Sequence, residues 1–362
     1  MFTSLSIKSF RGFKEVEVGS LGRVNLIAGS NGVGKTALLE AIYMLAGGTN
    51  VGLVVKIHSF RGFEKIVGLL DEVAESLWGP LFYDFDTKGV IEIEGQWHDA
   101  TKHRIEMELV PRVSAPVSFD DQGVGGAGAT ASGLSSKALQ VKYTDASGQC
   151  RESRMEIVRK SENSETGMQI TPPPQTPSFP GYFLAAKTIP LEEDATCFDE
   201  LVVRKDPYDV REVLLIIEPR LAEMRPVKRA GVNVLWGDIG LSRMFPVALM
   251  GDGLVRLTSI LVRIATAGHG IVLIDEIENG FHYTVLGKVW AAIGEAARRF
   301  DAQVFATTHS WECIRAAHEA FAAGGTYDLR LHRLDRVNGE IQAVTFDQEM
   351  LETALATDLE VR

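Results

Sequence analysis

The sequence predicts an α/β protein with a mixed central sheet, an antiparallel β subdomain and a short helical insert. Three observations lead to this fold class. A short apolar run at residues 24–28 is followed by a glycine-rich loop and then by strong helix formers. A second apolar run, at residues 270–274, has the unbroken pattern of a parallel strand that is covered on both faces. Between residues 90 and 158 apolar residues alternate with charged ones, which is typical of antiparallel strands with one solvated face.

The glycine-rich loop carries the strongest chemical signal. It has the form G-x-x-x-x-G-K-[ST] and lies between a predicted strand and a predicted helix, the context in which this pattern binds phosphate. Its backbone N–H groups converge on a phosphate, and the N-terminus of the helix adds partial positive charge. We expect Lys35 to contact the β- and γ-phosphates of a nucleotide and the hydroxyl of Thr36 to hold Mg²⁺. The loop consists of Gly29, Ser30, Asn31, Gly32, Val33, Gly34, Lys35 and Thr36.

The composition limits the class of protein. With 362 residues, 45% of them hydrophobic and 23% charged, the chain resembles an ordinary water-soluble protein. Its net charge of −11 disfavours a general affinity for nucleic acid, so DNA binding would need a local basic patch or a groove between two copies. No apolar run approaches ~20 residues, the length of a membrane span, and no signal-peptide pattern stands at the N-terminus. We therefore expect a cytoplasmic protein that does not contact a membrane.

The segment after the first helix repeats a short sequence found near the N-terminus. Residues 50–82 have a mostly helical pattern, and within them residues 59–63 repeat Ser-Phe-Arg-Gly-Phe, the sequence of residues 9–13. Five residues are too few for a repeat unit, so we interpret this echo as a coincidence.

The middle of the chain contains two irregular segments and one helical one. Residues 111–137 are rich in glycine and are predicted to form a flexible surface loop, whereas the prolines of residues 160–180 indicate a stiffer linker. Residues 191–225 have an amphipathic helical pattern, with a break at Glu218-Pro219.

The apolar run at residues 270–274 ends in two acidic residues. In proteins with a phosphate loop, a carboxylate at such a strand end holds Mg²⁺ beside the threonine of that loop, and Asp275 has this position. The adjacent Glu276 is placed to accept a proton from an attacking water, as a general base does. Acid pairs that begin a turn are common, and it is the upstream phosphate loop that makes the functional interpretation the better one.

A further apolar strand, residues 303–308, leads to His309. A histidine at this position, one helix beyond the acidic pair, can form a hydrogen bond with a γ-phosphate oxygen. Upstream, Gly251, Asp252 and Gly253 precede a helical pattern with an apolar stripe. Asp252 either caps this helix, or the helix N-terminus faces a phosphate that comes from outside this part of the molecule.

Taken together and in this order, these motifs resemble those of ABC-type ATPase heads found in SMC and RecF proteins, and most closely the OLD-like ATPases of bacterial defence systems. Residues 7–13 and 25–41 look like the N-terminal motif of that class, and residues 249–253 look like its signature loop. Residues 274–282 match its Walker B motif and D-loop, and residues 307–310 match its switch histidine.

The resemblance implies that two copies pack head to tail, with ATP and Mg²⁺ between the phosphate loop of one copy and the signature helix of the other. It adds Arg11 and Asn279 to the nucleotide-binding residues. It divides the chain into an N-terminal part of the head at 1–190, a helical insert at 191–230 and a C-terminal part at 231–362. The Ser-Gly-Gly of transporter signatures is absent, which argues against a transport ATPase.

The leading hypothesis is therefore an ATPase that acts as a nucleotide-driven switch between monomer and homodimer or higher homo-oligomer. In antiviral defence or DNA maintenance it would act through a separate effector protein such as a Toprim-like nuclease, because we find no acidic nuclease cluster in this sequence. One alternative is a nucleotide-gated scaffold with little turnover. Another is a RecF-like clamp that binds DNA, for which the acidic net charge is unfavourable.

Overall fold

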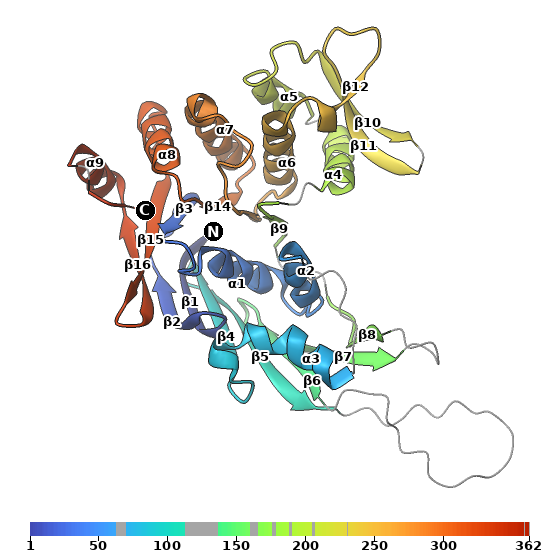
Figure 1. Cartoon of the computed structure of the whole chain (residues 1–362), viewed down its shortest axis with the longest axis vertical. Helices are drawn as coiled ribbons and strands as arrows, with labels where there is room; N and C mark the ends of the chain where they lie inside the picture. Colours follow the sequence, from blue (N-terminus) through green and yellow to red (C-terminus); the bar gives the residue numbers. More distant parts are fainter. Residues whose placement is uncertain are drawn as a thin grey trace, which may run out of the picture.

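A computed structural model gives the fold of the chain (Figure 1). It describes residues 1–62, 70–112, 137–159, 166–175, 179–187, 190–204, 207–229, 231–357 and 359–361. Most of the predicted loop at 111–137 lies outside the described residues. None of the helices in the described ranges is long and apolar enough to cross a bilayer.

A mixed sheet forms the centre of the molecule. Its strand order among the described residues is β16-β15-β3-β14-β13-β9. Parallel pairing runs from β15 through β3, β14 and β13 to β9, and β16 pairs antiparallel with β15. The strands are β3 (Val24–Gly29), β9 (Gly181–Leu184), β13 (Ile271–Ile274), β14 (Gln303–Thr307), β15 (Leu329–Val337) and β16 (Glu340–Phe346). The mixed sheet that the sequence predicts is confirmed.

An antiparallel sheet forms a second layer, with the order β2-β1-β4-β5-β6-β7-β8 among the described strands. These are β1 (Phe2–Phe10), β2 (Phe13–Val18), β4 (Ile91–Trp97), β5 (Lys102–Pro111), β6 (Lys137–Thr144), β7 (Cys150–Arg159) and β8 (Thr166–Thr171). The alternation of residues 90–158 thus predicted the right kind of sheet. The interpretation of 160–180 as a linker was wrong for β8, because its short Thr-Gly-Met-Gln-Ile-Thr sequence gains regular structure only by pairing with β7.

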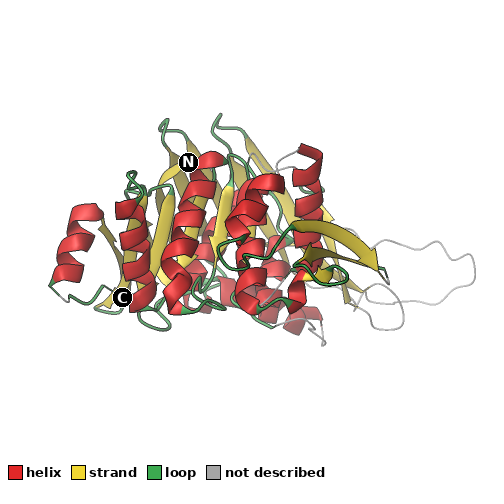
Figure 2. Ribbon diagram, turned by 90° about the horizontal axis from the view of Figure 1, so that it is seen from above, coloured by secondary structure: helices red, strands yellow, loops and turns green. Residues whose placement is uncertain are grey.

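Three helices lie between the two sheets, and most of the others cover the opposite face of the central sheet (Figure 1). The inner helices are α1 (Lys35–Gly47), α2 (Leu53–Phe60) and α3 (Leu70–Trp78), followed by the short turns η1 (Gly79–Leu81) and η2 (Tyr83–Phe85). The outer elements are α4 (Leu191–Arg204), α5 (Pro207–Leu214), η3 (Val247–Leu249), α6 (Asp252–Thr266), η4 (Tyr283–Val285), α7 (Leu286–Arg299), α8 (Trp311–Ala323) and α9 (Gln348–Ala356). Figure 2 faces the outer helical layer and shows several helices side by side in front of the strands.

The helical pattern of the insert is confirmed only as far as α5. A third sheet follows it, made of β10 (Glu223–Arg229), β11 (Val232–Asp238) and β12 (Phe245–Pro246). The expectation of helix to residue 225 was wrong, because α5 already ends at Leu214 and β10, which follows Pro219, pairs along its whole length with β11.

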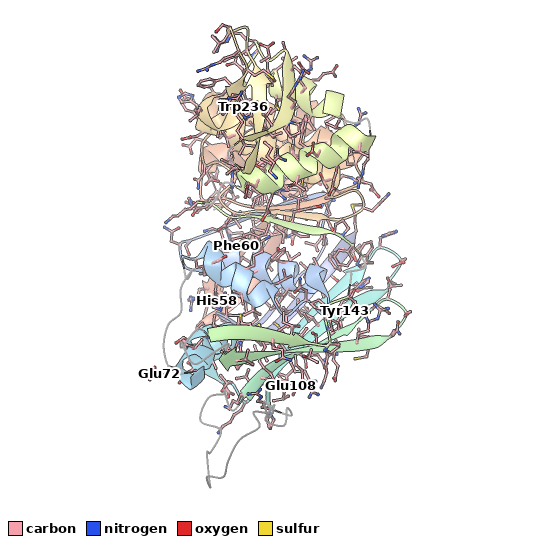
Figure 3. The ribbon with its side chains drawn as sticks, turned by 90° about the vertical axis from the view of Figure 1, so that its right-hand side faces the viewer. His58, Phe60, Glu72, Glu108, Tyr143 and Trp236 are labelled. Atoms are coloured by element: carbon pink, nitrogen blue, oxygen red, sulfur yellow. The ribbon has the colours of Figure 1, made fainter. Side chains whose placement is uncertain are left out.

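The central sheet separates two hydrophobic cores. Alternate residues of one strand belong to different cores: on β13, Val272 and Ile274 face α6 and α7, whereas Ile271 and Leu273 face α1. Figure 3 shows these layers edge-on, with Trp236 of β11 in the outermost layer, Phe60 of α2 between the sheets, and Tyr143 and Glu108 in the antiparallel sheet. Since both faces of β3, β13 and β14 are covered, their carboxyl ends are held at one edge of the sheet.

Candidate active site

A cavity of about 390 Å³ opens at that edge, where the phosphate loop follows β3. This volume lies within the usual range of ligand pockets. It is lined by Arg11, Gly12, Asn31, Gly32, Gly34, Lys35, Thr36, Ala37, Arg61, Asp275, Glu276, Thr307 and His309. The structure thus brings together nine of the predicted residues, from four separate segments of the chain.

The phosphate loop has a backbone that only glycine accommodates at two positions. Gly29 has a φ of 137°, and Gly34 has a φ of 104° with Phe13 so close that an added Cβ would lie 2.8 Å from its ring. Within this loop the ammonium of Lys35 donates to the backbone carbonyls of Gly29 and Ser30, at 2.6 and 3.1 Å. Burial lowers the pKa of Lys35, and the nearby Asp275 opposes this effect. Val33 is buried beneath the loop.

The carboxylate of Asp275 accepts hydrogen bonds from two hydroxyl groups. Thr36 Oγ1 lies 3.0 and 3.2 Å from its two oxygens, and Thr307 Oγ1 lies 2.7 Å from Oδ1. Burial raises the pKa of Asp275, and these hydrogen bonds oppose the increase. The described residues contain no cluster of three or more His, Cys, Asp or Glu side chains around a metal position. A hydroxyl and a single carboxylate beside a phosphate loop fit Mg²⁺, which is commonly held by one or two protein oxygens together with phosphates and water.

Glu276 lies at the mouth of the same cavity, and its carboxylate is partly exposed. Its backbone N–H donates to Thr307 Oγ1 at 2.8 Å, and its Oε2 accepts from Asn279 Nδ2 at 2.7 Å. His309 Nε2 stands 3.8 Å from Glu276 Oε1 and 3.9 Å from Glu278 Oε1, and the backbone N–H of His309 donates to Glu278 at 3.0 Å. The predicted base, the D-loop asparagine and the switch histidine therefore form one cluster.

The predicted signature residues are not among those that line this cavity. Gly251 is the N-cap of α6 and Asp252 is its first residue, both exposed, with no side-chain hydrogen bond capping the helix. The interpretation of Asp252 as a helix cap was wrong, because Gly251 with a φ of 111° makes the turn and places Asp252 inside the helix. Gly253 packs against the D-loop, where an added Cβ would lie 3.0 Å from the carbonyl oxygen of Gly280.

The sequence did not single out three residues that the structure places at the site. Thr307 forms hydrogen bonds with both Asp275 and the backbone N–H of Glu276. Arg61 lines the cavity beside Arg11. Arg256, buried in α6, donates to the carbonyls of Ala185 and Asp275 at 2.9 and 2.7 Å. Burial lowers the pKa of Arg256, an effect that the charge of Asp275 opposes. Arg61 left a trace in the sequence as the repeated Ser-Phe-Arg-Gly-Phe, and Thr307 lies in the segment 307–310 that resembles the switch motif, whereas Arg256 left none.

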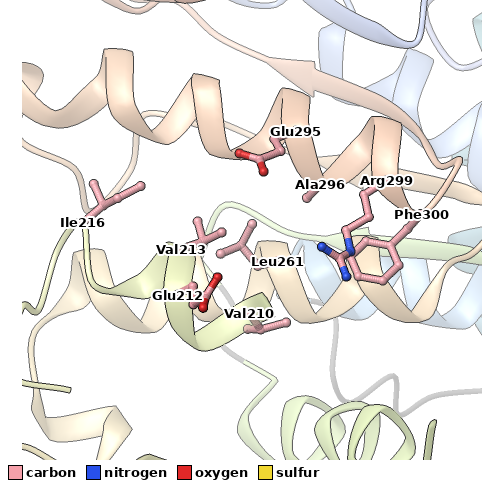
Figure 4. Close-up of a pocket in the computed structure, with 9 residues that line it drawn as sticks. All are labelled: Val210, Glu212, Val213, Ile216, Leu261, Glu295, Ala296, Arg299 and Phe300. Carbon is pink, nitrogen blue, oxygen red and sulfur yellow. The ribbon is translucent and has the colours of Figure 1, made fainter. Parts of the chain in front are cut away.

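A second cavity, of about 230 Å³, lies between α5, α6 and α7 and contains none of the predicted residues (Figure 4). Val210, Val213, Ile216, Leu261 and Phe300 give it an apolar wall, and Glu212, Glu295 and Arg299 contribute charge. Because it offers no set of backbone donors, it does not resemble a phosphate site.

Comparisons with known proteins agree with this geometry. A model for the family described as "AAA domain, putative AbiEii toxin, Type IV TA system" matches residues 81–314, and a second model, described as an AAA domain, matches residues 4–107. An ATP/GTP phosphatase of Helicobacter pylori is 24% identical over 339 residues, covering 87% of this chain and 86% of that protein. The DNA replication and repair protein RecF of Idiomarina loihiensis is 49% identical over 66 residues, covering 18% of this chain and 16% of RecF.

Among solved structures, the crystal structure of an Smc head bound to the C-terminal winged-helix domain of ScpA is similar over 96% of this chain and 98% of that one. The TM-score is 0.51 and the sequence identity 14%, a likeness of fold. The family match spans more than half of the chain and includes the segments predicted to be the Walker B motif, the D-loop and the signature loop. The chain therefore belongs to this family of AAA domains, and it is an ABC-type ATPase of the SMC/RecF-like class.

Proposed function

We propose that the chain hydrolyses ATP and uses the nucleotide to switch between a monomer and a head-to-tail homodimer. The observation that carries this proposal is the convergence of Lys35, Thr36, Asp275, Glu276 and His309 on one cavity. The H. pylori relative, an ATP/GTP phosphatase similar over most of both chains, supports the same chemistry.

Each side chain has a role that follows from its position. Lys35, held by two loop carbonyls, keeps a donor for the terminal phosphates of ATP. Thr36 and Asp275 would hold Mg²⁺, which neutralises charge that develops on the phosphates. Glu276 accepts a proton from the attacking water, and Asn279 keeps its carboxylate in place. His309 is positioned to form a hydrogen bond with the γ-phosphate.

We infer the dimer because the predicted signature residues are not among those that line the cavity. Gly251 and Asp252 are exposed at an N-terminus of α6 without a side-chain cap, so its free N–H groups are available to a phosphate from a second copy. In this arrangement each site is complete only when two copies meet. Binding energy from the γ-phosphate then favours the closed dimer, and hydrolysis removes it.

The experiment compares the mass in solution of wild type, Glu276→Gln and Lys35→Ala, with and without ATP and Mg²⁺. Glu276→Gln should form a stable dimer with ATP, because it binds but does not hydrolyse, and Lys35→Ala should stay monomeric. Glu349→Gln, an exposed position on α9, serves as the matched control. A Glu276→Gln variant whose mass is unchanged by ATP would rule out the dimer switch.

Phosphate release separates this proposal from a nucleotide-gated scaffold. Steady release by wild type that is abolished in Lys35→Ala supports an enzyme, whereas tight binding without release supports the scaffold. For a DNA clamp the ion pairs of the insert are unfavourable, since Arg220 pairs with Glu218 at 2.9 Å and Arg225 pairs with Glu223.

The biological output that we propose is antiviral defence or DNA maintenance through a separate effector. The likeness to OLD-like ATPases, the family description and the winged-helix partner of the Smc head all motivate an effector that binds the head. Purification of the tagged chain with and without ATP, followed by identification of proteins retained only in one state, tests this part. Retention of no protein in either state would contradict it.

A further inference from the structure

The two copies of Ser-Phe-Arg-Gly-Phe place their arginines at one point of the structure. Arg11 lies in the turn between β1 and β2 with a φ of 52°, and Arg61 follows α2 with a φ of −93°. The copies therefore differ in local conformation, which agrees with their being no structural repeat. Both arginines nevertheless line the phosphate cavity.

The carboxylate of Glu40 joins the two arginines. Glu40 lies one turn beyond Thr36 on α1, and its side chain is only 1% exposed. Arg11 Nε lies 2.5 Å from Glu40 Oε2, and Arg61 Nε lies 2.7 Å from Oε1. Each oxygen of the Glu40 carboxylate therefore faces one guanidinium. The charges of Glu40, Arg11 and Arg61 sum to +1 at the wall of the cavity.

This arrangement leaves the outer nitrogens of Arg61 available to a ligand. Its Nε is bound to Glu40, its side chain is 38% exposed, and it faces the same cavity as Lys35. Burial lowers the pKa of Arg61, but the hydrogen bond and charge of Glu40 and the charge of Asp275 outweigh it, so that the pKa is raised. A guanidinium held through Nε presents its two remaining nitrogens as a fork, the geometry that suits phosphate oxygens.

We propose that Glu40 is a positioning residue that holds Arg11 and Arg61 as a paired cationic clamp for the terminal phosphates of the bound nucleotide. The inference rests on the proposed function, because it requires a nucleoside triphosphate at the phosphate loop. It adds Arg61 as a phosphate-binding residue and explains why a glutamate is buried beside a site for an anion. Lysine at position 61 cannot replace arginine, since one ammonium does not contact Glu40 and span two phosphate oxygens as a fork does.

A purely structural role makes different predictions. A buried Arg–Glu–Arg triad can simply fasten the end of α2 to α1, and such triads contribute little net stability. In that case substitutions change the unfolding free energy but weaken the binding of adenosine mono-, di- and triphosphates equally. A clamp on terminal phosphates weakens the triphosphate selectively.

The experiment measures equilibrium binding of fluorescent adenosine mono-, di- and triphosphate to the full chain. Arg61→Lys, Arg61→Ala and Glu40→Gln should each weaken triphosphate binding about tenfold and monophosphate binding less than about twofold. In the Arg11→Ala/Arg61→Ala background, Glu40→Gln should add less than about twofold, because Glu40 acts through these two arginines. Arg225→Lys, an exposed and paired arginine on β10, is the matched control and should bind like wild type.

The outcomes are distinct for the two proposals. Wild type that binds no adenine nucleotide, or Lys35→Ala that binds as wild type does, overturns the proposed function. Wild-type binding that is lost in Lys35→Ala but unchanged in Arg61→Lys overturns only the clamp. A further loss of more than about twofold when Glu40→Gln is added to the Arg11→Ala/Arg61→Ala variant, or equal losses for all three nucleotides, also overturns it. If Glu40→Gln does not fold, the two substitutions of the half-exposed Arg61 still decide the question.

Discussion

The hydroxyl of Thr307 donates a hydrogen bond of 2.7 Å to Oδ1 of Asp275. The same carboxylate oxygen accepts a hydrogen bond from Thr36 at 3.0 Å, so the end of β14, the end of β13 and the start of α1 are tied together at one atom. Residues that form hydrogen bonds with a metal ligand orient that ligand. We therefore expect Thr307 to orient the carboxylate of Asp275 toward Mg²⁺.

The first prediction concerns Thr307→Val, which keeps the shape of the side chain and removes its hydroxyl. We expect the Mg²⁺ concentration needed for half-maximal phosphate release to rise about tenfold, as is usual when a partner of a metal ligand is lost. Thr307→Ser, which retains the hydroxyl, should stay close to wild type. An unchanged Mg²⁺ titration for the valine variant would show that Thr307 does not orient Asp275.

The second prediction concerns Arg256, whose guanidinium connects α6 to the ends of β9 and β13. Arg256→Met should lower the free energy of unfolding by about 3 kcal/mol, because two carbonyls lose a charged donor in a buried place. The measurement is unfolding in urea, with Arg336→Met as the control, since Arg336 is exposed on β15. Equal stability of the two variants would contradict this role for Arg256.

The third prediction concerns the backbone of the phosphate loop. Gly34→Ala should lower the free energy of unfolding by about 1–2 kcal/mol and weaken nucleotide binding, because the new Cβ meets Phe13 and the φ of 104° is strained for alanine. Gly287→Ala is the matched control. It lies in α7 with no atom within 4 Å of the added Cβ, so its stability should be unchanged or slightly higher. Normal binding by Gly34→Ala would show that the loop tolerates a side chain there.

The fourth prediction concerns acid stability and His332 on β15. Its Nε2 lies 3.1 Å from Asn25 Oδ1 and its Nδ1 lies 2.9 Å from Thr345 Oγ1, and burial lowers its pKa from 6.5 to about 3. Between these pH values the unfolded chain binds a proton at His332 and the folded chain does not. The stabilisation is therefore complete above about pH 6.5 and is lost as the pH falls toward 3.

When the pH falls from 7 to 5, proton binding to His332 in the unfolded chain should lower the free energy of unfolding by about 2 kcal/mol. His332→Gln should remove that part of the pH dependence, and urea unfolding at the two pH values measures the difference. A remaining slope is expected from other groups, among them His58, whose pKa is also lowered by burial. If the variant and wild type lose stability in parallel, His332 does not carry the effect.

Much of the site could be predicted because its signals are local. The phosphate loop is a continuous segment, and Asp275, Glu276 and His309 each follow an apolar strand, so the topology of a parallel sheet brings them to one edge. Arg61 and Glu40 could not be found in this way. Their contact depends on how α2 packs beside α1, and an arginine or a glutamate in a helical pattern usually indicates a solvated face.

The errors in the fold have the same origin. The sequence of β8 lacks a strong alternation, and β10 carries Pro226 and several charges, so their strand conformation depends on pairing with β7 and β11. Arg256 was missed because it lies next to an apolar stripe on α6, and an arginine at such a position usually belongs to the solvent-exposed face of the helix. The structures of β8 and β10 and the burial of Arg256 depend on tertiary contacts, which the local hydrophobic periodicity of the sequence does not reveal.

The position of β3 determines when the phosphate loop can form during synthesis. β3 lies near the start of the chain, yet its neighbours on either side are β14 and β15, which follow it by more than 270 residues. On the ribosome the nascent N-terminal segment therefore waits for these strands to emerge before the loop acquires its supporting edge. The nucleotide capture that we propose would thus be a late event of biogenesis, and it would mark a polypeptide whose distant segments have already assembled.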